Sequence, residues 1–491
     1  MRARSSLVWT WVVALGCYSG STQTSGETEA GSGPGGSDAG PSGGPGGSGA
    51  GDATAGTSDA TPADSGSATD PDDSVGDTTA EEPPVEGPLL ERLLVTEFEV
   101  PQGVASGVNN WRIWGTGSLH VAPVFTTPRD ECGTLVGFTT GSGTPQVAVL
   151  DGSDALVTVL DLPAGLQLRG LAAEPGAYFG ALLWDDAADR IWIRRYDLDG
   201  VEQWSTELTN ADNDPTDFGI GDSRLEYGAG TYGAYYHVHS HSGHEGDTLK
   251  WVDADSGAGT NGWGWGCSHS MSNLLRYNPA VDAFMPACVT DCFPGTSGDF
   301  STNSIGGIYL DHNASKVIDV DAGCNGSVAG ELGGAALGPD GWSLVFNAHQ
   351  APATLGQSSY DPATMNQDIG LSVIATNLDA GAVVWLTDTP GVDEDDASIA
   401  RWQPGDDPAE QYLVGWHEPG DVWQLARIDA AGAFLEGPVD ISAVARWGRR
   451  DDPFRADPRG DVVWSWFDAP GSTTLRLARV QAGQGGQCGP T

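Results

Sequence analysis

A weak internal repeat limits the folds open to this chain more than any other feature of the sequence. A turn of the form D-x-x-G, shortened to D-x-G in the second copy, recurs after short apolar runs, as YDLDG at 196–200, TNLDAG at 376–381 and RIDAAG at 427–432. The last two copies begin 51 residues apart. Each unit therefore spans roughly 45 to 55 residues, a length typical of supersecondary units that stack on one another.

The runs between these turns predict β-strands. They are short, rich in β-branched and aromatic residues, and bounded by Gly, Pro and Asp, as in LVGF, FGALLW, IWIRRY and VVWSW. No long stretch has apolar residues at helical spacing, so we expect a nearly all-β fold. Units of about four strands cannot cover their own apolar faces, which favours a closed ring, a β-propeller of about seven blades. Tandem β-sandwiches are the alternative. The blades are expected to begin near Asp130, Arg169, Ser223, Asn273, Glu331, Asp396 and Arg446.

Three of the turns lead into the pattern Gly-x-x-x-Trp, at 200–204, 259–263 and 381–385. This pattern resembles the tryptophan-docking repeat of quinoprotein-like propellers, in which a tryptophan of the outer strand packs between adjacent blades. The resemblance covers three of about seven units and lacks the threonine that precedes the glycine in that family. It implies the fold and does not imply the quinone cofactor.

Residues 1–17 predict an export signal. Arg2 and Arg4 precede a short, weakly polar to apolar run that ends in ALGC, too short to span a bilayer. ALGC resembles the bacterial lipobox, and the resemblance implies that Cys17 becomes the lipidated first residue of the mature protein. Because Tyr18 is not Asp, it also implies sorting to the outer membrane. Plain secretion, with Cys17 an ordinary signal residue, is the alternative.

Residues 18–88 predict a disordered linker. Gly, Ser, Thr, Ala, Asp and Pro dominate this segment, and it contains no Lys or Arg. It has too little apolar surface to offset the entropy of ordering, and as a flexible chain it reaches about 45 Å. Residues 89–491 are then expected to form one folded unit, the β-propeller domain.

The net charge of −45 limits the possible partners. Nucleic acid and anionic lipid headgroups are disfavoured, so we expect membrane attachment through the lipid anchor only. A protein, a glycan or a cation remains open as the ligand.

Six cysteines follow Cys17, and in an exported chain an even number predicts disulfides. Cys132 and Cys488 lie near the two ends of the folded part and would join them. The other four are expected to pair among themselves: Cys267, Cys288, Cys292 and Cys324. A zinc cluster is the alternative, but no CxxC motif occurs.

Five of the nine histidines lie between residues 235 and 273. Strand alternation puts His237, His239 and His241 on one side of a strand, and propeller topology opens the loops after second and fourth strands on one face. His239, His241, His244 and His269 are therefore candidate ligands for Zn²⁺ or Cu²⁺. The alternative is a structural or substrate-contacting polar cluster bonded to nearby backbone and serines.

Other side chains are expected on the same face: His349 and His417, with Glu245, Asp247 and Glu418 nearby. The D-x-D-x-G stretches at 253–257 and 319–323 resemble calcium loops, but they lack the later bidentate Glu and also fit ordinary strand turns. We therefore predict a binding or scaffold module that acts through a histidine-rich face. A metal-dependent hydrolase or oxidoreductase that uses the same histidines is the alternative.

Overall fold

The computed structural model describes residues 87–105, 124–130, 132–185, 187–188, 190–208, 218–240, 245–266, 270–290, 307–310, 315–319, 330–338, 341–350, 366–403, 410–447 and 452–483. The chain divides into two units, Met1–Thr78 and Thr79–Thr491, and every described residue belongs to the second. The predicted signal peptide and nearly all of the predicted linker lie outside the described residues. Within the described part, no helix is long and apolar enough to cross a membrane.

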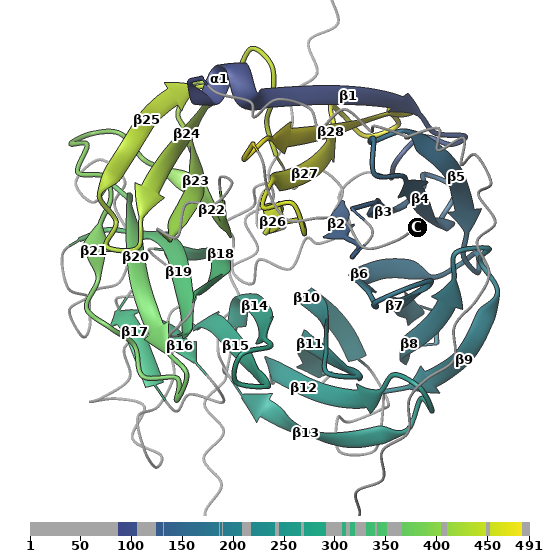
Figure 1. The fold of residues 1–491 in the computed structure, drawn as a ribbon. Coiled ribbons are helices and arrows are strands. Elements are labelled where there is room, and N and C mark those ends of the chain that lie inside the picture. Colours follow the sequence, from purple (N-terminus) through teal and green to yellow (C-terminus); the bar gives the residue numbers. More distant parts are fainter. Residues whose placement is uncertain are drawn as a thin grey trace, which may run out of the picture. The chain divides into compact units, whose positions relative to one another are not determined.

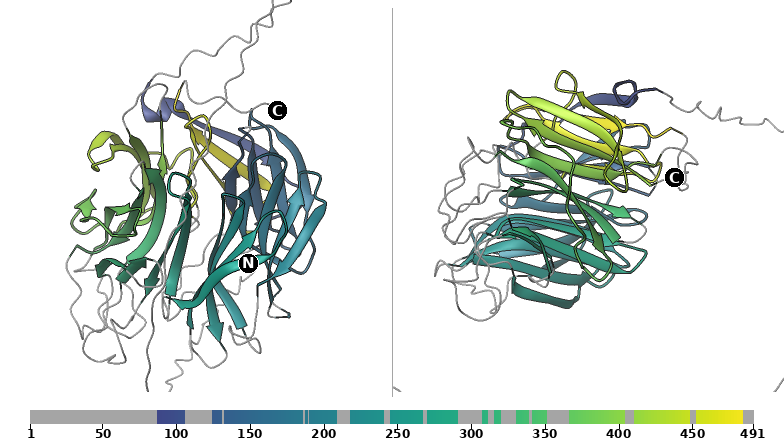
Figure 2. Two further views of the ribbon diagram at one scale, coloured as in Figure 1. Left: turned by 60° about the horizontal axis from the view of Figure 1, so that its bottom comes forward. Right: turned by 90° about the vertical axis from the view of Figure 1, so that its left-hand side faces the viewer.

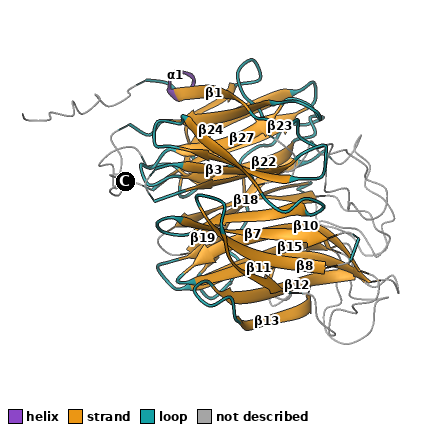
Figure 3. Ribbon diagram, turned by 90° about the vertical axis from the view of Figure 1, so that its right-hand side faces the viewer, coloured by secondary structure: helices purple, strands orange, loops and turns teal. Residues whose placement is uncertain are grey.

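Seven antiparallel sheets of four strands each form a ring (Figure 1), which confirms the predicted all-β propeller. Tandem sandwiches were therefore the wrong alternative. The oblique and edge-on views show the sheets packed side by side around the ring (Figures 2 and 3). In six of the sheets the first strand along the chain lies innermost, and each innermost strand contacts the next around the ring.

We number the sheets as blades 1 to 7 in chain order. Blade 1 contains β2 (Phe125–Pro128), β3 (Thr134–Thr139), β4 (Pro145–Leu150) and β5 (Leu156–Asp161). Blade 2 contains β6 (Gln167–Ala173), β7 (Tyr178–Asp185), β8 (Arg190–Asp197) and β9 (Glu202–Glu207). Blade 3 contains β10 (Phe218–Gly228), β11 (Thr231–Ser240), β12 (Glu245–Asp253) and β13 (Gly259–Gly266). Blade 4 contains β14 (Ser270–Asn278), β15 (Ala283–Thr290), β16 (Gly307–Leu310) and β17 (Ser315–Asp319). Blade 5 contains β18 (Gly330–Gly338), β19 (Gly341–Ala348), β20 (Asp368–Ala375) and β21 (Val384–Trp385). Blade 6 contains β22 (Asp395–Arg401), β23 (Gln411–Glu418), β24 (Val422–Asp429) and β25 (Phe434–Asp440).

Blade 7 is built from both ends of the folded part. Its inner strands are β26 (Arg455–Ala456), β27 (Val462–Phe467) and β28 (Thr474–Val480), and its outer strand is β1 (Leu93–Glu99). The register between β1 and β28 runs from Leu93 opposite Val480 to Glu99 opposite Thr474. The short helix α1 (Leu89–Arg92) precedes β1 and buries Leu89 completely. The N-terminal strand therefore closes the ring.

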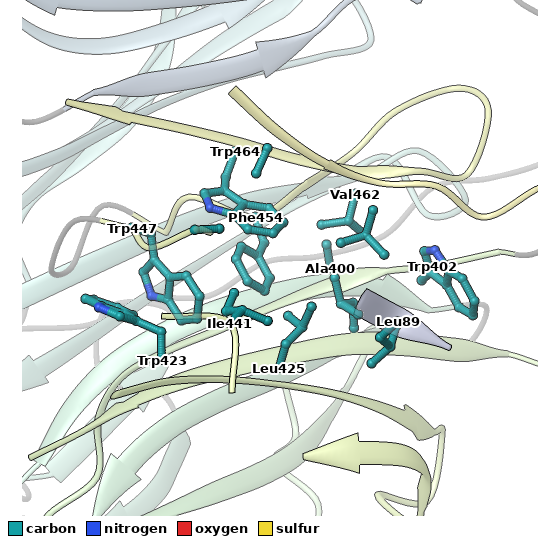
Figure 4. Packing of buried hydrophobic residues seen from close by; sticks show 14 of the residues in the cluster. Leu89, Ala400, Trp402, Trp423, Leu425, Ile441, Trp447, Phe454, Val462 and Trp464 are labelled. Atoms are coloured by element: carbon teal, nitrogen blue, oxygen red, sulfur yellow. The ribbon is translucent and has the colours of Figure 1, made fainter. Parts of the chain in front are cut away.

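An aromatic cluster fills the space between blades 6 and 7 (Figure 4). The ring centroid of Trp447 lies 4.5 Å from that of Trp423, 4.9 Å from Phe454 and 6.1 Å from Trp464. The Trp447 indole also donates a hydrogen bond to the carbonyl of Asp396 in β22, at 2.9 Å. Large buried aromatic surfaces of this kind contribute strongly to packing, and here they fix the start of β26 against β22.

The Gly-x-x-x-Trp tryptophans all lie on outermost strands, or at their ends. Trp204 of blade 2 docks on blade 3, because its indole N–H donates to the Ala254 carbonyl at 2.8 Å. The other two make edge-on ring contacts within their own sheets: Trp263 with Tyr235 at 5.7 Å, and Trp385 with Phe346 at 6.0 Å.

Candidate functional site

Five of the seven innermost strands carry an irregularity in their pairing with the second strand of the blade. The shifts lie at 168/170 in β6, 220/223 in β10, 270/272 in β14, 332/335 in β18 and 395/398 in β22. A β-bulge redirects side chains and frees backbone groups for other partners. The predicted blade starts Arg169, Ser223, Asn273, Glu331 and Asp396 lie on these five strands, at or next to the bulges.

The bulges connect neighbouring blades by buried hydrogen bonds. Ser223 of blade 3 donates its hydroxyl to the Arg169 carbonyl of blade 2, at 2.7 Å. Asn273 of blade 4 donates its side-chain amide to the Asp222 carbonyl of blade 3, at 2.9 Å, and its backbone N–H to the Asp222 carboxylate, at 3.0 Å. These contacts hold the innermost strands at fixed positions around the axis.

The opposite ends of the innermost strands surround a cavity of about 480 Å³, which we call the channel cavity. Its walls come from six of the seven blades, namely the ends of β2, β10, β14, β18 and β22 together with β26 and the turn that follows β26. Figure 1 shows these strands converging on the centre of the ring. Ligand pockets usually have volumes of about 300 to 1,000 Å³, so a small molecule would fit.

Charged side chains dominate the polar part of this cavity. Its lining residues include four arginines, Arg276, Arg401, Arg455 and Arg459, but only two carboxylates, Glu226 and Asp457. The whole chain has 67 acidic residues against 22 Lys and Arg. The cavity wall thus has an excess of two positive charges in a strongly acidic protein.

Glu226 joins opposite sides of the ring. Its Oε1 accepts hydrogen bonds from Nη1 of Arg276 in blade 4 and from Nη1 of Arg455 in blade 7, both at 2.6 Å. Burial acts to raise the pKa of Glu226, but the charges of Arg455 and Arg276 outweigh it and hold the pKa below its usual value. Glu226 is therefore an anion that crosslinks two blades.

Arg276 is anchored on several sides. Only 5 % of the residue is exposed, its Nε donates to the Ala335 carbonyl at 3.1 Å, and it forms an ion pair with Asp452. Burial, followed by the charge of Arg455, lowers the pKa of Arg276 well below the usual arginine value, although Glu226 opposes this. Positive charge is thus crowded at this wall.

Arg459 and Arg401 differ in how they are held. Arg459 donates to the Gly152 carbonyl of the neighbouring blade at 2.8 Å and pairs with Asp457 at 2.9 Å. Arg401 is partly buried at the end of β22, and its Nε is shielded from solvent with no hydrogen-bond partner. Among the described residues, no hydrogen bond or ion pair engages the Arg401 guanidinium group.

The sequence did not single out these arginines as a site. Three of them, Arg276, Arg401 and Arg455, lie in strands and Arg459 lies in a turn, and only ring closure brings the four together. Their position at the ends of innermost strands was the one available signal.

The histidine-rich stretch is described only in part. His237 is 1 % exposed, and its Nδ1 lies 3.1 Å from the carboxylate of Asp247 in the adjacent strand β12. His239 pairs through its backbone with Glu245, while its side chain lies outside the description. His241, His244 and His269 also lie outside the described residues. The contact of His237 is of the kind expected for a structural polar cluster, and the metal site at the other four stays a prediction.

His349 directly follows β19 and is 3 % exposed, whereas His417 lies in β23 beside two carboxylates. The Nδ1 atom of His417 is 2.6 Å from Oδ1 of Asp395. One potential metal-binding atom from each of His417, Asp395 and Asp396 lies within 4.8 Å of the other two. These aspartates begin β22, so they lie at the opposite end of that strand from Arg401 in the channel cavity. The sequence predicts His417 on one face of the propeller, and neither it nor these two aspartates was among the predicted metal ligands.

One of the two D-x-D-x-G stretches is an ordinary turn within the described residues. The Asp253 carboxylate accepts hydrogen bonds from the backbone and hydroxyl of Ser256, at 2.8 and 2.6 Å, and Asp255 is exposed. Residues 320–323 of the second stretch lie outside the description. The predicted calcium sites therefore stay predictions.

Cys132 and Cys288 are buried and disulfide-bonded. Their predicted partners, Cys488 for the first and one of Cys267, Cys292 and Cys324 for the second, lie outside the described residues, so the pairing scheme stays a prediction. Cys17 also lies outside them.

Comparison with known proteins gives no family. No family model and no curated protein matches the chain. The β-propeller domain of the trilobed protease from Pyrococcus furiosus is 11 % identical, covers 75 % of this chain and 100 % of its own, and gives a TM-score of 0.41. The WD40 domain of Neurospora crassa Pan2 is 10 % identical, with 73 % and 88 % coverage and a TM-score of 0.37. A mutant of the Synechocystis apocarotenoid oxygenase is 10 % identical, with 71 % and 79 % coverage and a TM-score of 0.39. At these values the similarities carry no argument about ligand or activity.

Proposed function

We propose that this chain is an exported, lipid-tethered binding module whose propeller captures a small molecule in the channel cavity. The observation that carries the proposal is the cavity itself, about 480 Å³ in volume, bordered by six blades and lined by charged groups. A concave site with a few convergent polar groups is the usual form of a ligand site.

The cavity is preorganised by contacts that cross between blades. Glu226 joins Arg276 to Arg455, and Arg459 reaches the Gly152 carbonyl of blade 1. Side chains that are already fixed lose little conformational entropy when a ligand binds. The ring thus supports a binding role better than a loose surface patch would.

The tether belongs to the same proposal. A lipid on Cys17 and a linker over residues 18–88 would hold the propeller away from the outer membrane, at a distance on the order of 45 Å. The ligand would then be captured in the cell envelope or outside the cell.

A ligand screen with a blocked cavity tests this function. Ala456 is exposed and lines the cavity, so Ala456→Trp fills the opening without disturbing the buried core. Ala431→Trp, in the exposed turn between β24 and β25, is the matched control. Calorimetry with small molecules of all charge types should give ligands whose affinity falls at least about tenfold in Ala456→Trp and stays unchanged in Ala431→Trp. Ligands that bind both variants equally, or no ligand at all, would contradict the proposal.

A metal-dependent hydrolase or oxidoreductase on the other face is the second candidate function. The observation that favours it is the group formed by His417, Asp395 and Asp396, residue types that bind Zn²⁺. Metal analysis of protein purified without an affinity tag, before and after zinc loading, tests this candidate. Less than about 0.2 equivalents of metal would remove it, since a structural or catalytic site binds close to one.

A further inference from the structure

We infer that the ligand of the channel cavity is a small organic anion, with a carboxylate or phosphate group bound by Arg401. This inference rests on the proposed function, because it names the chemical class of the ligand for the same cavity.

The two carboxylates of the cavity wall are already engaged. Glu226 accepts hydrogen bonds from two arginines at 2.6 Å. Asp457 accepts from Arg479 at 2.5 Å and pairs with Arg459 at 2.9 Å. A cationic ligand would have to compete with these arginines for either carboxylate, so the wall disfavours cations.

Arg401 supplies the group that a bound anion needs. Its Nε is shielded from water and has no hydrogen-bond partner, and no ion pair among the described residues engages its guanidinium group. A guanidinium group presents donors in a fork that matches carboxylate and phosphate oxygens. An anion in the cavity would accept from the terminal Nη donors of Arg401, which no described residue engages, because the shielded Nε is out of a ligand's reach.

A second feature of the wall also favours negative charge. Arg276 and Arg455 share a single oxygen of Glu226, and of the two only Arg276 has a second carboxylate partner among the described residues, Asp452. The charge of Arg455 contributes, after burial, to the lowered pKa of Arg276. A ligand anion nearby would relieve this repulsion, whereas a neutral ligand would not.

The other lining residues and the surface define the rest of the ligand. Ala336, Leu337, Ala400 and Phe454 give the wall an apolar part, which suits an anion with a hydrophobic body. The net charge of −45 repels large polyanions. The chemistry therefore fits a small carboxylate or phosphate ester rather than nucleic acid or an acidic polymer.

Calorimetry at constant ionic strength tests the inference. The probes are phenyl phosphate, benzoate, inorganic phosphate and the neutral benzamide. Each probe is titrated into wild-type protein, Arg401→Gln and the control Arg190→Gln. Both substitutions remove one positive charge, but Arg190 lies on β8 with half of its side chain exposed. Because Arg401 makes no side-chain hydrogen bond, the variant should melt at the wild-type temperature.

Phenyl phosphate or benzoate should bind wild type and Arg190→Gln equally, and at least about tenfold more weakly to Arg401→Gln. Which of the two binds more tightly distinguishes phosphate from carboxylate ligands, and inorganic phosphate shows whether the apolar body is needed. Equal binding of benzamide and benzoate, or equal affinity of wild type and Arg401→Gln, would overturn the inference. If Ala456→Trp abolishes binding of neutral ligands while no anion binds, the anion inference fails and the proposed function stands. If no ligand of any charge type binds in the cavity, both fail.

Discussion

Glu394 is an acid buried at the start of blade 6, with 1 % of the residue exposed. Burial is the main cause that raises its pKa from the usual 4.5 to about 7. The charges of Asp368 and Glu418 also raise this pKa, whereas hydrogen bonds from Thr387 and Thr389 lower it. The folded protein thus holds this proton more tightly than the unfolded chain. The resulting stability is fully present below pH 4.5 and is lost as the pH rises through about 7.

Replacing Glu394 by glutamine should remove this pH dependence. Between pH 4.5 and about pH 7, the wild-type protein should lose on the order of 3 kcal/mol of unfolding free energy from this group. This follows from about 1.4 kcal/mol per pH unit. Urea unfolding of Glu394→Gln at pH 4.5 and pH 8 should show a smaller difference than wild type. The exposed Glu202→Gln on β9 should behave as wild type. Equal pH dependence in all three proteins would rule out this role of Glu394.

Arg479 joins blade 7 to blade 1 by buried ion pairs. Its guanidinium group makes two hydrogen bonds to Asp154, at 2.7 and 2.6 Å, and also contacts Asp457 and Asp461 at 2.5 and 3.0 Å. Burial acts to lower the pKa of Arg479, but the hydrogen bond and charge of Asp154 outweigh it and raise the pKa. Removing this cation would leave the Asp154 carboxylate without this buried ion pair and leave only Arg459 beside Asp457 and Asp461.

Arg479→Ala should therefore destabilise the protein by about 3 to 5 kcal/mol, the cost of breaking a buried ion pair from one side. Arg190→Ala removes an exposed pair with Glu207 and should cost less than about 1 kcal/mol. Urea unfolding at pH 7 measures both. Similar losses in the two variants would mean that the Arg479 cluster adds little to stability.

At the scale of the elements, strand β1 decides whether the ring closes. It covers the outer edge of β28 and, with α1, buries Phe98 and Leu89. Without it, β28 would present unpaired backbone groups at a sheet edge, which favours aggregation.

Truncation tests this closure. A chain that begins at residue 100 should have an unfolding free energy about 3 to 6 kcal/mol lower than one that begins at residue 87, because it lacks the two large apolar side chains that are buried. Its melting temperature should fall, and it should aggregate on heating. Equal melting temperatures for the two truncated chains would show that the other described strands close the ring alone.

For the whole molecule, the prediction concerns where the propeller is held. Cys17→Ser should abolish labelling with a radioactive fatty acid and move the protein from the membrane fraction to the soluble fraction, because Cys17 is the expected site of lipidation. The propeller should still bind its ligand with wild-type affinity, since the linker only tethers it. A Cys17→Ser protein that stays in the membrane fraction would contradict the lipid anchor.

Much of the fold was predictable because its signals are local. Turn residues and alternating strands mark each blade within about 50 residues of sequence, and the expected starts at Arg169, Ser223 and Asn273 fall in innermost strands. The closure by β1 was not predictable, because Leu93 and Val480 pair across nearly the whole folded part and leave no local signal. His417 was expected on one face, whereas its partner Asp395 could be found only from the strand register.

The sequence by itself determined that this chain forms short strands in repeating units, and that these must stack to cover their apolar faces. Only the tertiary structure decided which charged residues meet. Glu226, Arg276, Arg401 and Arg455 are separated by up to 229 residues and look like isolated surface charges in the sequence. They converge because ring closure brings the ends of the innermost strands to one axis. Strand periodicity is a property of neighbouring residues, so it contains no information about which blades face each other across that axis.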